Sequence, residues 1–524
     1  MTSHLWHMLD RTWTRALLCV ALTSGMPGVP SAQTAQDPST AEAIRLREVG
    51  DLAGAARVLR ARLQVHPDDG DAARLLAQTL YWLGERAEAR ALYETALVRH
   101  PNDTAVRLDY GRMLVELLDT RSARALLTPL TTAGSARGRA ATLLGLIDYW
   151  SGNLAGATRW FNAALHADST QPDALRYRRE IASLTAPWVR VLISGRRDNQ
   201  PMRQSGAGIE AGWFPVPDWS LAARAAPSRF PTGAATTRDA LDLMAATHGF
   251  VPALRLTIDG EGGVHHRSWG RASDWTGRAA AMLRIGGPFS LGVAAQRAPY
   301  LHTVRSLDSA VVTASLTGTL RLETPRGWLG EAALGRQRFP DDNVISTAHA
   351  WLLAPIARGP RGLLQAGYAF AMQDADETRF TLTDTTPAFP PGQSITTLRG
   401  HYDPYFTPAA LRSHALVASL VVRPSDATAL RFNGSYALRA QDRAPVFVEV
   451  PAVPPLGTTV VLDSYDRRFS PWDARASFEA GTAVGSAIRL TAGHSRTVFY
   501  STSSLEVAVV MRMARWQLRR VAGT

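Results

Sequence analysis

The feature that most constrains this chain is a pattern of small and large apolar residues that repeats every 34 positions between Ala43 and Ser169. One set of equivalent positions is mostly glycine, the next is alanine in every copy, and a third is bulky and apolar. The last set is proline in the first two copies and serine in the others. In that order the sets are Gly50, Gly84, Leu118 and Gly152; Ala55, Ala89, Ala123 and Ala157; Leu59, Tyr93, Leu127 and Phe161; Pro67, Pro101, Ser135 and Ser169.

This period and these residue types resemble the tetratricopeptide repeat, a helix-turn-helix unit that stacks on its neighbours into a solenoid. The sequence predicts a solenoid at 41–186, made of four repeats and a capping helix at Asp173–Leu184. Such a scaffold does not by itself reveal what it binds. The residues expected to pack its helices together are Gly50, Gly84, Gly152, Ala55, Ala89, Ala123, Ala157, Tyr93 and Phe161.

The segment before the repeats has the pattern of an export signal. Arg11 and Arg15 precede an apolar run, and small residues end at Ala32. We expect a signal peptide at 1–32 and a linker at 33–40. Cys19, the single cysteine, would leave with the signal, so the mature chain would hold no disulfide or thiolate site.

From Trp188 onward the apolar period changes to two, which is typical of strands with one apolar and one polar face. At 363–373, for example, Leu364, Tyr368 and Met372 alternate with Gln365 and Gln373. A soluble β-sandwich would show the same alternation.

Connector lengths favour a membrane barrel over a sandwich. Every second connection is short, whereas the intervening ones tend to be longer and more polar, above all Asp374–Leu411 and Gln441–Asp466. The expected short connections are Phe214–Asp218, His248–Pro252, Gly286–Pro288, Thr324–Gly327, Ala357–Gly362, Arg423–Asp426 and Thr482–Ser486. The sequence therefore predicts an antiparallel barrel of about 16 strands at 187–524.

Seven tryptophans of the second part of the chain fall mostly near predicted strand ends, as an aromatic girdle at a membrane interface would. They are Trp213, Trp219, Trp269, Trp275, Trp328, Trp351 and Trp472.

The formal net charge is +12, and the positive excess is dispersed over the second part of the chain. Dispersed arginine on strands suits a polar lumen or lipid headgroups, so we expect no nucleic-acid partner.

The sequence offers no catalytic motif in a convincing context, and we expect no enzyme activity, cofactor or resident metal. His265 and His266 are expected in an outer loop, where a metal or hydrolase site is the less favoured interpretation. The carboxylates around Asp341 and Asp374 are more simply solvated loop charges than a calcium site.

The most distinctive string is at 399–408, where His401, Tyr402, Asp403, Tyr405 and Phe406 crowd together. Flat rings can cover the apolar faces of sugars while carboxylate and imidazole reach their hydroxyls. A proline-stiffened loop that packs on itself is an equally good interpretation.

The string resembles a segment in the C-terminal barrel of the outer-membrane exporter encoded by cellulose synthase operons, a family with an N-terminal tetratricopeptide array. The stretches at 287–299 and 365–368 are also similar, and the resemblance covers about residues 280–440. It implies polymer contacts by the loop residues and by Arg297. Related export porins serve poly-N-acetylglucosamine, and this chain has four repeats where the cellulose exporter's array is much longer.

Together these observations predict an α+β multidomain protein of the bacterial outer membrane, with its solenoid in the periplasm and a conduit for an exopolysaccharide. Expected partners are the polysaccharide, periplasmic or inner-membrane synthase components and outer-membrane lipid. Two alternatives are an envelope scaffold whose barrel is mainly an anchor, and a surface enzyme acting on lipid or glycan.

Overall fold

The computed structural model describes residues 38–132, 134–199, 202–232, 237–270, 273–324, 326–387, 396–451, 458–482, 486–498 and 500–513. The expected signal peptide lies outside these residues. The chain divides into two compact units, which meet in sequence between Ile181 and Ala182. Within the described residues, no helix is both long enough and apolar enough to span a membrane.

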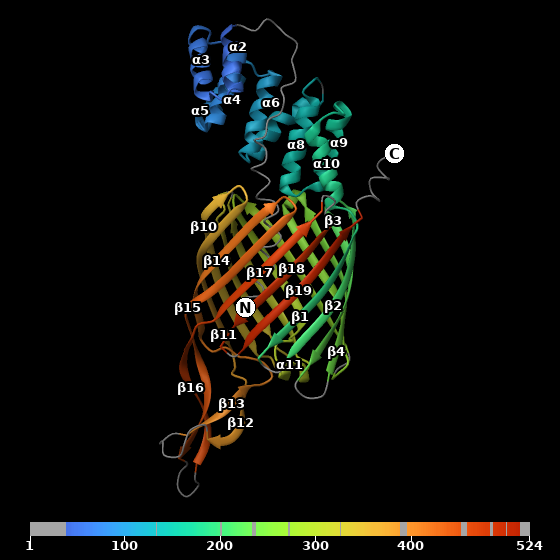
Figure 1. The fold of residues 1–524 in the computed structure, drawn as a ribbon, viewed down its shortest axis with the longest axis vertical. Helices are drawn as coiled ribbons and strands as arrows, with labels where there is room; N and C mark the ends of the chain where they lie inside the picture. The colour runs from blue at the N-terminus through green and yellow to red at the C-terminus, as the bar shows by residue number, and fades with distance from the viewer. Residues whose placement is uncertain are drawn as a thin grey trace. The chain divides into compact units, whose positions relative to one another are not determined.

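The first unit is built of helix pairs, followed by one further helix (Figure 1). Its α2 begins at Pro38, inside the segment expected to be a linker. The helices are α2 (Pro38–Glu48), α3 (Leu52–Val65), α4 (Gly70–Leu83), α5 (Arg86–Arg99), α6 (Thr104–Glu116), α7 (Thr120–Leu127), the 3₁₀ turn η2 (Thr128–Thr131), α8 (Arg137–Ser151), α9 (Leu154–Ala167) and α10 (Pro172–Leu184).

The turn inside each repeat needs a left-handed backbone. Gly50, Gly84 and Gly152 have φ of 85°, 90° and 88°, and Leu118 occupies the equivalent position with φ of 62°. Glycine adopts this conformation at little cost because it has no Cβ. These positions therefore recur every 34 residues because each turn requires a left-handed backbone. In the third repeat Leu118 adopts this conformation under strain.

Small and large side chains alternate where the helices touch. Ala55, Ala89, Ala123 and Ala157 have no exposed surface, so neighbouring backbones approach closely there. The bulky positions are also in the core: Phe161 is 0% and Tyr93 is 1% exposed. Phe161 stacks on Tyr177 of α10 with ring centroids 5.7 Å apart, and this contact covers the end of the apolar core.

The second unit is a closed antiparallel barrel of 16 strands, as the sequence predicts. The barrel closes where the last strand pairs with the first, in register from Trp188↔Arg512 to Asp198↔Thr502. Its strands are β1 (Trp188–Asp198), β2 (Arg203–Val216), β3 (Trp219–Pro231), β4 (Thr237–Val251), β5 (Leu256–Arg267), β6 (Ser273–Gly286), β7 (Phe289–Pro299), β8 (Val312–Glu323), β9 (Leu329–Arg338), β10 (Val344–Gly359), β11 (Gly362–Ala375), β14 (Leu411–Ser425), β15 (Thr428–Pro451), β17 (Trp472–Gly481), β18 (Ala487–Arg496) and β19 (Ser501–Arg512).

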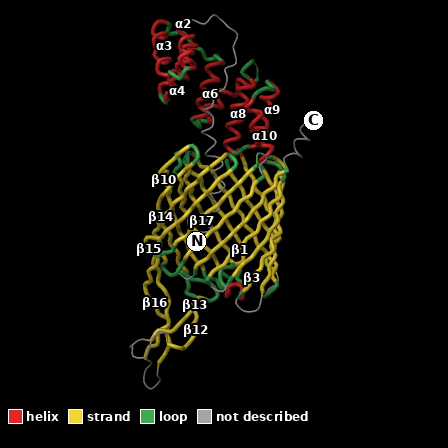
Figure 2. Tube along the Cα trace, viewed as in Figure 1, coloured by secondary structure: helices red, strands yellow, loops and turns green. Residues whose placement is uncertain are grey.

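Three further strands lie in the two longest connections, which sequence composition predicts to be polar loops. They are β12 (Phe380–Pro387), β13 (Thr396–Tyr402) and β16 (Thr458–Phe469). With the outer part of β15 they form an extension beyond the long-loop end of the barrel (Figure 2). β-Branched runs such as Thr458–Val461 carry a strand signal that loop composition obscures.

Strand register separates an outer from an inner face. On β11, Tyr368 and Met372 are 46% and 40% exposed on the outer face, whereas Gln365 is fully buried on the inner face. Two tryptophans do not belong to the expected girdle. Trp351 is 8% exposed and faces inward, and Trp269 donates its indole N–H to the carbonyl of Leu307 in another loop.

We predict that Phe161→Ala lowers the free energy of unfolding of the helical unit by about 3–5 kcal/mol, because it leaves a cavity in a fully buried site. Urea denaturation followed by circular dichroism at 222 nm measures this. Val98→Ala is the control, since Val98 is 81% exposed and should change stability little. A loss of less than about 1 kcal/mol for Phe161→Ala would contradict the packing described.

Candidate functional site

The inner face of the barrel is lined by polar and charged side chains. Opposed residues of an antiparallel pair share a face, so Arg190, Glu210 and Arg224 project together into the lumen from β1, β2 and β3. Ile209 and Trp213, in the intervening positions, are 54% and 50% exposed on the outer face. The lumen is therefore the polar side of the sheet.

Most luminal carboxylates have a basic partner. Arg190 lies 2.5 Å from Glu210, Arg321 lies 3.1 Å from Glu331, and Arg267 pairs with Asp274. These contacts neutralise charge that would otherwise be costly to hold at a partly desolvated wall.

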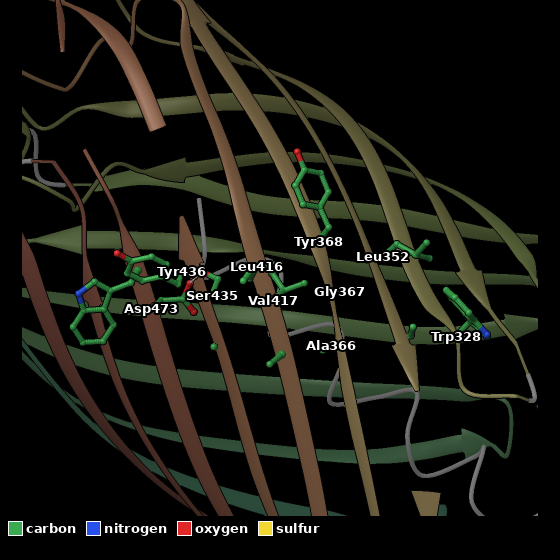
Figure 3. A pocket seen from close by; sticks show the side chains of 14 residues that line it. Trp328, Leu352, Ala366, Gly367, Tyr368, Leu416, Val417, Ser435, Tyr436 and Asp473 are labelled. Carbon is green, nitrogen blue, oxygen red and sulfur yellow. Dashed lines mark hydrogen bonds between the residues drawn. The ribbon is translucent and has the colours of Figure 1, made fainter. Parts of the chain in front are cut away.

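The outer face is apolar and carries no comparable site among the described residues. One hollow on it is lined mainly by outward-facing apolar side chains, including Leu352, Tyr368 and Leu416 (Figure 3). It exists because small residues such as Ala366 and Ala418 lie between the large ones. We interpret it as surface that lipid would cover and place no function there.

At the long-loop end, connections from distant parts of the chain meet in a group that we name the mouth cap: Tyr300, Thr303, Phe339, Asp341 and Tyr405. The rings of Phe339 and Tyr405 stack with centroids 3.6 Å apart, and Tyr300 meets both edge-on. The Thr303 hydroxyl donates to the carbonyl of Pro404 at 3.0 Å. The cap therefore joins the β7–β8, β9–β10 and β11–β14 connections.

Asp341 is the polar centre of the mouth cap. The Tyr405 hydroxyl donates to its carboxylate at 2.7 Å, and Arg379 Nε donates at 2.6 Å. Desolvation opposes ionisation, but these two groups outweigh it and hold the pKa of Asp341 below its ordinary 3.8. Burial raises the pKa of Tyr405, and its bond to Asp341 raises it further.

The cap also reaches the far side of the barrel. Burial raises the pKa of Tyr300, and Tyr500 raises it further while Arg196 opposes the shift. Arg196 is on β1 and Tyr500 precedes β19, whereas Tyr300 follows β7. The β7–β8 connection therefore brings Tyr300 within electrostatic range of β1 and of the residue that precedes β19.

A short helix in that connection, α11 (Val304–Asp308), packs against the wall. Leu307 is fully buried with Phe230, and Arg238 of β4 pairs with Asp308. Together with the mouth cap, α11 occupies the long-loop end of the lumen.

The residues of the 399–408 string are divided by the structure. Tyr405 is 1% exposed and belongs to the mouth cap. The ring of Tyr402 is edge-on to Phe406 with centroids 4.8 Å apart, and both are half-buried. His401 shares a 2.7 Å hydrogen bond with Thr383, and its Nε2 is 3.8 Å from Asp403. Hence Tyr405 is buried, whereas the other four aromatic and polar residues of the string, His401, Tyr402, Asp403 and Phe406, retain some exposed surface.

Arg297 lies apart from that string. It is opposed to Gly277 on the outward side of β7, its guanidinium is 4.4 Å from the ring centroid of Trp275, and it donates to the Trp275 carbonyl. Alternation along β7 explains this position, because Leu291 and Val293 share its face and are exposed. The structure thus gives no support to a polymer contact by Arg297 in the lumen.

His265 and His266 lie on β5 and not in a loop, which corrects their expected location. His265 points inward and bonds Asp242 at 2.7 Å, while His266 points outward and bonds Ser273. Among the described residues, no group of three or more His, Cys, Asp or Glu side chains is placed to hold a metal ion.

We predict that Asp341→Asn loosens the mouth cap. The low pKa of Asp341 in the folded chain means that its contribution is complete above about pH 4 and is lost as the pH falls through the folded value. Hydrogen–deuterium exchange at residues 339–343 and 403–408 should rise in the variant at neutral pH, and in the natural chain only in acid.

The control for that experiment is Asp342→Asn. The side chain of Asp342 is 78% exposed and bonds only Arg338 among the described residues, so its loss should leave exchange unchanged. Equal exchange in the two variants would contradict the central position of Asp341.

The tetratricopeptide repeat family model matches residues 46–108 of this chain. No curated protein matches it. The chain is similar to a solved bacterial polysaccharide outer membrane secretin, with a TM-score of 0.44 and 11% identity over 63% of this chain and 99% of that one.

The helical unit is similar to PilF of Pseudomonas aeruginosa, with a TM-score of 0.26 and 23% identity over 27% of this chain and 65% of that one. It is also similar to MamA of Desulfovibrio magneticus RS-1, with a TM-score of 0.25 and 20% identity over 27% of this chain and 80% of that one. At these scores the similarities carry no argument about function. The family match and the strand pairing nevertheless establish a chain that joins tetratricopeptide repeats to a closed antiparallel β-barrel of 16 strands.

Proposed function

We propose that this protein is an outer-membrane conduit through which a bacterium exports a polysaccharide. The observation that carries the proposal is a polar lumen whose long-loop end is held covered by hydrogen bonds and stacked rings. Barrels of 16 or more strands are wide enough to enclose an aqueous channel. A cover of noncovalent contacts can open without breaking a covalent bond.

The outer face supports the membrane location. Large apolar side chains are exposed on it around the barrel, among them Leu291, Leu334, Leu416 and Leu505. In water such a surface would drive aggregation, whereas lipid hydrocarbon covers it at no cost. A closed barrel also satisfies its backbone hydrogen bonds without water.

The orientation follows from the connections. The three longest connections, β7–β8, β11–β14 and β15–β17, all lie at one end of the barrel, and turns such as Gly287-Pro288 lie at the other. In bacterial barrels the short turns face the periplasm. The even strand count places Trp188 and Arg512 at the same, short-turn end. The repeats precede β1 in sequence, so we assign them to the periplasm.

In this proposal the protein binds and guides but catalyses no reaction. Luminal amides, hydroxyls and guanidinium groups can exchange hydrogen bonds with a moving sugar chain, and polymer synthesis at the inner membrane would drive transport. The repeats would bind synthase components or the nascent polymer, whose sugar backbone is cellulose-like or that of a related glycan in view of the resemblance of residues 280–440.

We predict that Tyr405→Ala combined with Asp341→Ala raises single-channel conductance in planar bilayers, because it removes both the ring stack and the polar centre of the mouth cap. Trp213→Ala on the outer face is the matched control and should leave conductance unchanged. A barrel that only anchors the repeats would show no conductance in any variant, and that result would overturn the conduit.

We also predict that Tyr402→Ala combined with Phe406→Ala lowers polymer secretion in the producing bacterium, since these half-buried rings are accessible to a sugar chain. Tyr436→Ala, on the outer face of β15, should secrete normally. Barrel assembly is checked by heat-modifiable migration on gels. Unchanged secretion in the double variant would end the interpretation of this loop as a sugar contact.

A further inference from the structure

Three arginines gather around one carboxylate on the luminal face near the short-turn end. Arg431 Nη1 lies 3.1 Å and Arg489 Nη2 lies 2.9 Å from the same oxygen of Glu479. Arg423 lies on β14 two positions after Val421, which is opposed to Arg431, and it interacts electrostatically with both Arg431 and Glu479. We name Arg423, Arg431, Glu479 and Arg489 the guanidinium cluster.

The cluster holds more positive than negative charge. Its single carboxylate, that of Glu479, already forms ion pairs with Arg431 and Arg489. Arg423 is repelled by the nearby like charge of Arg431. The Nε of Arg423 is buried without a hydrogen-bond partner among the described residues. Besides Glu479, the carboxylate that acts on Arg423 is Asp426 in the adjoining turn. Even with Asp426 included, one positive charge remains.

Several basic groups elsewhere in the described lumen are matched: Arg267 with Asp274, His248 with Asp259, and Arg321 with Glu331. Arg224 and Arg278 form no ion pair among the described residues, but each is opposed to a luminal glutamate. An unmatched guanidinium in a partly desolvated wall is costly unless something else supplies an anion or a hydrogen-bond acceptor.

A row of polar groups leads from this region toward the long-loop end. Cross-strand pairing places Gln365, Ser419, Asn433, Arg475, Gly493 and Ser504 side by side, and the row ends at Arg196 and Gln204. Gln365 is near the short-turn end of β11, whereas Gln204 is near the long-loop end of β2. Strand tilt makes such a row climb the barrel.

The row contains no carboxylate, and its two arginines form no ion pair among the described residues. Asp473 lies two positions before Arg475 on β17, and Asp198 lies two positions after Arg196 on β1. These carboxylates balance the charge of the two arginines in the part of the lumen nearer the long-loop end. Discrimination by charge therefore rests on the guanidinium cluster, while the row supplies donors along the path.

We propose that the polymer carried by this barrel is an anionic polysaccharide, bearing carboxylate or acidic ester groups, and that the guanidinium cluster selects it at the periplasmic entrance. This inference rests on the proposed conduit function. Guanidinium groups bind such oxyanions through paired, charge-assisted hydrogen bonds, and rings of arginine are how pores favour anions. The unmatched Arg423 is the member that an incoming anion would satisfy.

The test uses full-length protein in planar bilayers, in the background with Tyr405→Ala and Asp341→Ala that opens the mouth cap. Probes are oligogalacturonate, which is anionic, and cello-oligosaccharide of equal length, which is neutral, applied from the short-turn side. Arg423→Glu and the milder Arg423→Gln are compared with Arg412→Gln, which removes an arginine from the outer face of the same strand.

We expect oligogalacturonate to block the current at a concentration about ten-fold lower than the neutral sugar, with this advantage lost in Arg423→Glu, reduced in Arg423→Gln and kept in Arg412→Gln. In a KCl gradient, the reversal potential should move from the chloride toward the potassium equilibrium potential. The shift should be largest in Arg423→Glu, smaller in Arg423→Gln and absent in Arg412→Gln.

The remaining outcomes separate the two proposals. Equal block by both sugars, or an anionic preference that survives Arg423→Glu, overturns the charge selection and leaves the conduit standing. Absence of current in the opened background overturns the conduit itself.

Discussion

The structure depends on one pairing, that of β19 with β1 across eleven residue pairs. An open sheet of this size would expose a row of backbone N–H and C=O groups on each edge, which hydrocarbon cannot satisfy. Closure removes both edges and divides the surroundings of the sheet into an outside and an inside. Every charged luminal residue depends on that division, because strand alternation alone decides which side chains lipid must accept and which can be polar.

The same alternation explains how far the sequence predicts the structure. Leu364, Tyr368 and Met372 all lie on even-numbered positions of an alternating pattern and face outward, so periodicity alone indicates their side, and a count of about 16 strands follows from turn spacing. The repeat period likewise marks the left-handed turns at Gly50, Gly84 and Gly152. In both cases the information lies within a few residues of the feature.

The candidate site is different because its contacts join distant segments. Tyr405 resembles an exposed aromatic in sequence, but it is covered by Phe339 and held by Asp341, 64 positions away. Arg431 and Glu479 are 48 positions apart, and no local pattern indicates that their strands are neighbours. The direction of Arg297 could have been deduced from alternation along β7, since it shares parity with Leu291 and Val293.

β15 has a mechanical consequence because it is one uninterrupted strand from Thr428 to Pro451. Its inner part carries Arg431 in the lumen, and its outer part pairs with β13 and β16 in the extension. A pull on the extension along the strand acts on the hydrogen bonds to β14 and β17 sideways and all together, since those bonds are perpendicular to the strand. Shear of this kind is resisted by many bonds at once, so the extension can bear tension without the barrel wall separating strand by strand.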